Sequence, residues 1–122
     1  LRTTPWRMVL VEGLREMPSL PQLITAPDDP LLRVIACTGA PACTQAHLAT
    51  RDLARAIAAH IPQGQTCHIS GCAKGCAHPF PAAITLTATP RGFDLVQNGR
   101  AGDTPLRADL DASHISQALN AP

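Results

Sequence analysis

The sequence predicts an α/β (α+β) fold, in which a mixed sheet contains a βαβ unit and carries flanking helices. A short β-branched apolar run, 31–37, and a second short predicted strand, 66–71, enclose a segment with helical apolar periodicity, 44–61. Two further runs, 82–89 and 92–99, are separated by only two residues, as the strands of an antiparallel hairpin are. A chain of 122 residues is long enough to bury one hydrophobic core.

The bulk composition excludes several classes of function. Apolar residues make up 45% of the chain and charged residues 16%, which is typical of a globular domain. The net charge of +1 argues against a broad electrostatic contact with nucleic acid or a membrane surface. The sequence contains no run of roughly 18 apolar residues and no recognisable signal peptide. We therefore expect a cytoplasmic location, with neither nucleic acid nor membrane as a partner.

The amino-terminal part of the chain differs in composition from the rest. Residues 8–11 predict a strand that ends at Gly13, and we expect Trp6 beside it to be packed against apolar neighbours. Residues 14–30 are rich in proline and allow at most a short helix at 18–25.

The chain opens on Leu1 rather than on methionine, and we expect it to be a piece of a longer protein. Residues 1–30 are then a segment that links from a preceding region, and residues 31–122 form the domain. That preceding region of the same protein is an expected partner.

The segment 44–61 is the clearest predicted element. Its apolar residues recur at helical spacing (Leu48, Leu53, Ile57 and Ile61). Thr44 is the expected N-cap, and Pro62 ends the helix. The basic residues of this helix are expected to face solvent (His47, Arg51, Arg55 and His60).

A strand, a helix of this length and a second strand predict a parallel pair. Both strands, 31–37 and 66–71, then place their carboxyl ends at the same edge of the sheet, where open α/β sheets bind ligands. After the predicted hairpin, which turns at Pro90-Arg91, Asp111 is expected to cap a last helix at 112–120.

Four of the five cysteines form two closely spaced pairs. Cys37 and Cys43 have the spacing C-x5-C, and Cys72 and Cys76 have the spacing C-x3-C. Cys37 ends a predicted strand, Cys43 opens the predicted helix, and Cys72 follows the next strand. The four thiols are therefore expected to converge at one edge of the sheet.

Converging thiolates suit soft metals, either zinc or an iron–sulfur cluster. Structural zinc sites use tighter pairs than C-x5-C, whereas loop-borne cysteines with wider spacing suit a 4Fe–4S cluster. Neighbouring glycines let backbone N–H groups approach the cluster sulfides. The helix dipole would add thiolate character at Cys43. Two alternatives stay open at this point, a structural zinc domain and an electron-transfer module.

The stretches CTGAPAC (37–43) and SGCAKGC (70–76) resemble the cluster-binding domain of the sirohaem-dependent nitrite and sulfite reductases. That family has the pattern C-x5-C followed by GC-x3-C. The resemblance implies the fold of that domain and a 4Fe–4S cluster on Cys37, Cys43, Cys72 and Cys76. It also implies that Cys76 lies next to the iron of sirohaem, if the chain is a reductase.

The sequence departs from the reductases between and after the last two cysteines. The reductases usually have Pro-Asn-Gly there, with an arginine shortly after, whereas this chain has Ala73-Lys74-Gly75 and then Ala77-His78-Pro79. GCAKGCAHP is similar to the branch that contains the precorrin-3B synthases, and LRTTPWR (1–7) is similar to the segment that precedes their cluster domain. A sirohaem-dependent reductase is the alternative.

The synthase branch implies an oxidoreductase of aerobic cobalamin biosynthesis that hydroxylates the tetrapyrrole precorrin-3A with O2. It implies a tetrapyrrole substrate, an electron donor and a mononuclear iron in the full enzyme. Lys74 and His78 are the candidate catalytic residues. Cys67 is expected to be a structural thiol of the core, and His68 a hydrogen-bonded structural histidine.

Overall fold

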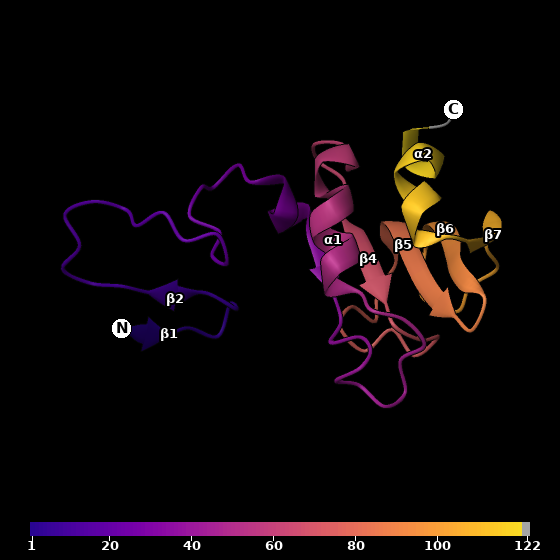
Figure 1. Ribbon diagram of the computed structural model, residues 1–122. Helices are drawn as coiled ribbons and strands as arrows, with labels where there is room; N and C mark the ends of the chain where they lie inside the picture. The colour runs from indigo at the N-terminus through magenta and orange to yellow at the C-terminus, as the bar shows by residue number, and fades with distance from the viewer. Residues whose placement is uncertain (121–122) are drawn as a thin grey trace.

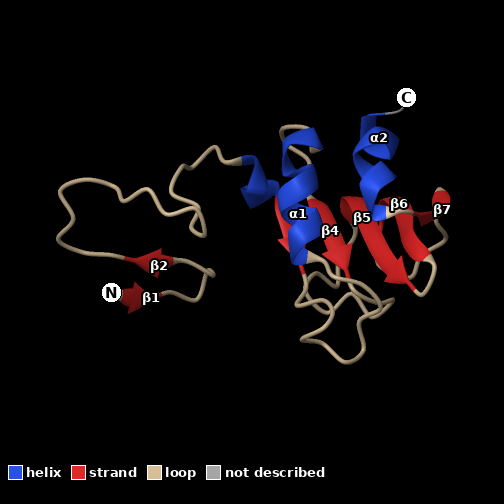
Figure 2. Cartoon of the chain, viewed as in Figure 1, coloured by secondary structure: helices blue, strands red, loops and turns tan. Residues whose placement is uncertain are grey.

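The computed structural model describes residues 1–120 and contains a five-stranded mixed sheet with helices on one face (Figures 1 and 2). The strands run in chain order across the sheet, β3-β4-β5-β6-β7. β3, β4 and β5 are parallel neighbours, and β5, β6 and β7 are antiparallel neighbours. The elements are β3 (Val34–Ala36), α1 (Arg51–Ile57), β4 (Cys67–Ser70), β5 (Ala82–Thr89), β6 (Gly92–Gly99), β7 (Arg107–Leu110) and α2 (Ile115–Asn120).

The predicted α/β class and its βαβ unit are confirmed, because α1 connects the parallel neighbours β3 and β4. The more specific prediction, the fold of the nitrite and sulfite reductase cluster domain, stays a prediction.

The hydrophobic core lies between the sheet and the two helices. Ile57 of α1 and Ile115 of α2 are buried against Ile69, Leu86 and other inward-facing residues of the sheet. Burying a side chain of this size stabilises the fold by about 1.5–3 kcal/mol. The core therefore holds the carboxyl ends of β3 and β4 in fixed positions under the cysteine loops.

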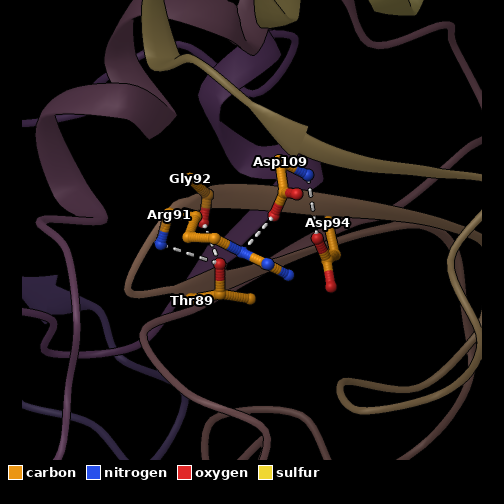
Figure 3. Close-up of polar contacts among 5 residues, drawn as sticks. All are labelled: Thr89, Arg91, Gly92, Asp94 and Asp109. Atoms are coloured by element: carbon orange, nitrogen blue, oxygen red, sulfur yellow. Dashed lines mark hydrogen bonds and ion pairs between the residues drawn. The ribbon is translucent and has the colours of Figure 1, made fainter.

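The hairpin of β5 and β6 has the predicted bounds and the predicted turn. Thr89 pairs with Gly92 across Pro90-Arg91. The Thr89 hydroxyl donates to the Gly92 carbonyl over 3.1 Å and accepts from the Arg91 N–H over 3.2 Å (Figure 3). The following strand, β7, was not predicted because it has only 4 residues, too few for its pattern to indicate a strand.

The prediction of a helix over 44–61 is wrong at its amino-terminal end. Helix α1 begins at Arg51, and a 3-10 turn, Ala58–His60, continues it. The Thr50 hydroxyl donates to the Cys37 carbonyl over 2.6 Å, and residues before it form a loop. Thr44 is therefore not an N-cap, and Cys43 does not lie at a helix N-terminus.

The strand predicted at 31–37 is shorter than expected. Pro30–Arg33 forms a 3-10 helix, and only Val34–Ala36 are in strand β3. Asp29 caps the 3-10 helix by accepting the Leu31 N–H over 2.9 Å. The guanidinium of Arg33 donates to the Ile61 carbonyl over 2.7 Å, which ties the Pro30–Arg33 turn to the residue that follows the 3-10 turn after α1.

The last helix is confirmed. A 3-10 turn, Ala112–His114, leads into α2, and the Asp111 carboxylate accepts from the Ser113 N–H over 2.9 Å. The Ser113 hydroxyl also donates to this carboxylate, over 2.6 Å. The hydroxyl hydrogen bond, and after it the one from the Ser113 N–H, hold the pKa of Asp111 below its usual value.

The first 28 residues form an arm that extends away from the sheet (Figure 1). β1 (Arg2–Thr3) and β2 (Val9–Leu10) pair antiparallel, and no helix forms at 18–25. Trp6 is 71% exposed, so the expectation that it is packed is wrong. No other element within residues 1–120 buries the apolar side chains of the arm. Within residues 1–120, no helix combines the length and apolar character needed to cross a membrane.

Candidate metal centre

Two loops at one edge of the sheet carry the four paired cysteines. The first cysteine loop follows β3 and carries Cys37, directly after the strand, and Cys43. The second cysteine loop follows β4 and carries Cys72, one glycine after the strand, and Cys76. Because β3 and β4 are parallel neighbours, both loops leave the sheet at the same edge (Figure 1). None of the cysteines is in a disulfide.

Cys37 is held by three hydrogen bonds. Its N–H donates to the Ile69 carbonyl over 3.0 Å, and its carbonyl accepts from the Thr50 hydroxyl over 2.6 Å. Its Sγ accepts from the Gly71 N–H over 3.0 Å. A hydrogen bond from a backbone N–H stabilises a thiolate relative to the thiol. The backbone around Cys37 is thus positioned by β4, α1 and the second cysteine loop.

Gly71 is the point where the two loops touch. A Cβ at this position would lie 2.7 Å from Ala46 Cβ and 3.3 Å from Cys37 Sγ. The His47 N–H donates to the Gly71 carbonyl over 2.8 Å. Only glycine allows this close approach, which is why the first loop can pack directly on the start of the second.

The loop Cys72–Cys76 is shaped by its own backbone. The Ser70 hydroxyl donates to the Cys72 carbonyl over 2.6 Å. The His78 N–H donates to the Gly75 carbonyl over 3.1 Å, and Gly75 has a φ of +63°. Cys72 is half-buried and Cys76 is exposed, so both thiols are accessible to an entering ligand.

The donor set fits a soft metal or an iron–sulfur cluster in its chemistry. It offers free thiols on two touching loops and a backbone N–H directed at one sulfur. Among residues 1–120, no three side chains of cysteine, histidine, aspartate or glutamate are grouped as they would be around a single metal ion. That all four cysteines hold one 4Fe–4S cluster therefore stays a prediction.

Cys67 lies in the core, as predicted. It is fully buried in β4, and burial raises the pKa of its thiol to about 12. The thiol consequently stays protonated at neutral pH, and it is not available as a thiolate ligand.

His68 departs from its prediction. The sequence predicts a hydrogen-bonded structural histidine, but both ring nitrogens are buried and have no partner among residues 1–120. Burial, and after it the charge of His78, lowers the pKa of His68 to about 4. The ring is therefore neutral at physiological pH. An alternating strand pattern indicates which face a side chain occupies, but not whether that face offers a hydrogen-bond partner.

The two candidate catalytic residues lie in different surroundings. Lys74 is exposed on the second cysteine loop. His78 is half-buried, and its ring lies edge-on to the rings of His68, at a centroid distance of 5.6 Å, and Phe80, at 5.8 Å. His78 thus packs against the residues beneath the loop, while Lys74 is free to reach a bound molecule.

A cavity of about 380 Å³ borders the second cysteine loop at Ala73. Its polar lining includes His47, Thr87, Asp94 and Asp103. Asp94 accepts the N–H of Asp109 over 3.1 Å (Figure 3). Two carboxylates disfavour a ligand that itself carries many carboxylates, because like charges repel.

Comparisons with known proteins agree with the motif analysis in part. No protein-family model matches the chain. A curated relative from Sinorhizobium sp, named precorrin-3B synthase, is 38% identical over 98 residues. The match covers 77% of this chain and 21% of the relative, so the chain spans about a fifth of the length of the curated relative it matches.

Proposed function

We propose that this chain is the cysteine-bearing part of an oxidoreductase of cobalamin biosynthesis that converts precorrin-3A to precorrin-3B with O2. The observation that carries the proposal is the pair of cysteine loops, C-x5-C and C-x3-C, that leave neighbouring parallel strands at one edge of the sheet. The 38% identity to a protein named precorrin-3B synthase supports the same assignment.

In this proposal, Cys37, Cys43, Cys72 and Cys76 hold a 4Fe–4S cluster. Such a cluster transfers one electron at a time. The chain's own contribution is to fix the ligands and their surroundings. The Gly71 N–H stabilises negative charge on Cys37 Sγ, and Thr50 holds the Cys37 backbone.

The substrate would be a tetrapyrrole with many carboxylates, and this chain offers little to bind them. Its net charge is +1, and the lining of the cavity beside Ala73 holds Asp94 and Asp103, with His47 as its one basic residue. Basic residues from the rest of the protein would bind the substrate, and Lys74 is the nearest candidate from this chain. An electron donor and a mononuclear iron complete the enzyme in this proposal.

The reaction would insert one oxygen atom of O2 into the tetrapyrrole at C20 and release the other as water. The balance requires two electrons and two protons from the donor. The test is turnover of precorrin-3A by the full-length protein under ¹⁸O2 with a reductant, read by mass spectrometry. We expect a single ¹⁸O in the product.

The matched variants are Cys76→Ser, which removes a proposed ligand, and Cys67→Ala, which changes a buried thiol of the core. Turnover should be lost in the first variant and retained in the second. A product without ¹⁸O would overturn the assignment. A Soret absorption band together with reduction of nitrite or sulfite would favour the sirohaem-dependent reductases instead.

A further inference from the structure

His68 occupies the face of the sheet opposite the helices. It lies in β4, with Ile35 of β3 and Thr85 of β5 as its neighbours in register, and its exposed fraction is 0%. Nδ1 and Nε2 are both buried and have no hydrogen-bond partner among residues 1–120. A neutral imidazole carries one donor and one acceptor, and burying both unpaired is unfavourable.

Within residues 1–120, no group of the surrounding sheet makes a hydrogen bond to the His68 ring. The Thr85 hydroxyl already donates to the Gly99 carbonyl over 2.9 Å, and Val96, the next residue in register on β6, is apolar. The Thr87 hydroxyl, two residues further along β5 on the same face, is likewise buried without a partner among residues 1–120. The layer that covers this face is the remaining source of a partner for the ring.

That layer is the second cysteine loop. A Cβ at Gly75 would lie 3.6 Å from His68 Cε1, so the loop backbone beside Cys76 rests directly on the ring. The ring of His78 lies edge-on beside the His68 ring, with 5.6 Å between the ring centroids. The buried ring nitrogens are thus covered by the segment that carries two of the four paired cysteines.

We propose that His68 donates a hydrogen bond from its ring N–H to the group held by the cysteine loops, at a cluster sulfide or at the Cys76 thiolate. The inference rests on the proposed function, because it needs a cluster at Cys37, Cys43, Cys72 and Cys76. His68 is then a positioning residue that tunes the cluster. An N–H donor stabilises the more negative, reduced cluster and raises its reduction potential.

The test uses the full chain, reconstituted anaerobically with ferrous iron and sulfide. His68→Leu removes the donor, His68→Gln keeps an N–H donor, and His60→Leu is the control at an exposed histidine. Iron and labile sulfide should be equal in all four proteins. We expect His68→Leu to weaken reduction about tenfold, a fall of about 59 mV for one electron, and His68→Gln to stay nearer the wild type.

A second readout keeps the inference falsifiable if His68→Leu does not fold. In the reduced wild-type chain labelled with ¹⁵N-histidine, pulsed EPR should show coupling of the cluster spin to a ¹⁵N nucleus, and His68→Gln should abolish it. A wild-type cluster with no such coupling, or a potential in His68→Leu equal to that of the wild type, would overturn the inference. A wild-type chain that binds no iron and sulfide would overturn the proposed function, and this inference with it.

Discussion

At the scale of single residues, the first cysteine loop requires a residue without a side chain at position 39. Gly39 has a φ of +71°, and a Cβ there would lie 2.5 Å from Thr50 Oγ1 and 2.8 Å from Thr50 N. The same Thr50 hydroxyl donates to the Cys37 carbonyl. The loop therefore packs against the start of α1 only because position 39 carries no side chain.

Gly39→Ala should destabilise the protein more than Gly64→Ala. Both glycines have similar backbone angles, with φ of +71° and +79°, but Gly64 has open space around it. We expect Gly64→Ala to lower the free energy of unfolding by about 1–2 kcal/mol, the cost of a left-handed backbone. Gly39→Ala should cost about 1–3 kcal/mol more, from the clash with Thr50. Urea unfolding measures both, and equal losses would contradict this account of the loop.

His68 should make the stability of the metal-free protein depend on pH. Its pKa in the folded state is about 4, against 6.5 for the unfolded chain. Between these values the unfolded state binds more protons, so the free energy of unfolding falls as the pH falls through this window. The loss attributable to His68 approaches about 3 kcal/mol near pH 4, at 1.36 kcal/mol per pKa unit.

Urea unfolding of the metal-free chain at several pH values from neutral to about pH 4 measures this loss. His68→Gln should flatten the dependence on pH, and His60→Gln, at an exposed position, should leave it unchanged. If wild type and His68→Gln respond equally to pH, His68 is not the neutral buried ring described above.

At the scale of elements, sequence patterns predicted the elements that depend on contacts between residues close in sequence. The hairpin of β5 and β6 follows from two apolar runs around a two-residue turn, and its bounds are as predicted. The helical period over 44–61 is equally regular, yet the helix begins only at Arg51. Hydrogen bonds between segments distant in sequence, from Thr50 to Cys37 and from His47 to Gly71, hold residues before it in a loop. Contacts between distant segments do not change the apolar periodicity of a sequence, so this periodicity could not predict where the helix begins.

The sequence likewise predicted one part of the candidate site and missed another. The spacing of the cysteines and the order of strand, helix and strand placed both loops at one edge of the sheet. The unpaired ring of His68 was missed, because its lack of a partner depends on Thr85 and Val96 in neighbouring strands.

Thr50→Val should destabilise the protein by removing the hydrogen bond between the start of α1 and the first cysteine loop. Thr50 is 1% exposed, and its hydroxyl is the group that ties the Cys37 carbonyl to the helix. Valine keeps the shape and leaves that carbonyl without this donor, so we expect a loss of about 1–3 kcal/mol in the free energy of unfolding. Thr50→Ser keeps the hydroxyl and should lose less. A valine variant as stable as the serine variant would show that the hydrogen bond contributes little.

At the scale of the whole molecule, the arm and the sheet contribute unequally to stability. Apart from the half-buried Thr4, residues 1–28 are exposed. Removing them should change the free energy of unfolding by no more than about 0.5 kcal/mol, the usual range for surface changes. Removing residues 1–33 should cost more, because Leu31 packs on the core and Arg33 bonds the Ile61 carbonyl. Calorimetry of both truncated chains measures the difference, and a large loss from the first truncation would contradict it.

The central claim is that Cys37, Cys43, Cys72 and Cys76 together hold one 4Fe–4S cluster. The most direct measurement is the count of iron and labile sulfide per chain after anaerobic reconstitution, in the wild type, in alanine variants of these four cysteines and in Cys67→Ala. The account predicts about four iron and four sulfide for the wild type and Cys67→Ala, and a clear loss in each of the other four variants. Zinc without labile sulfide, or iron that is indifferent to all four cysteines, would contradict it.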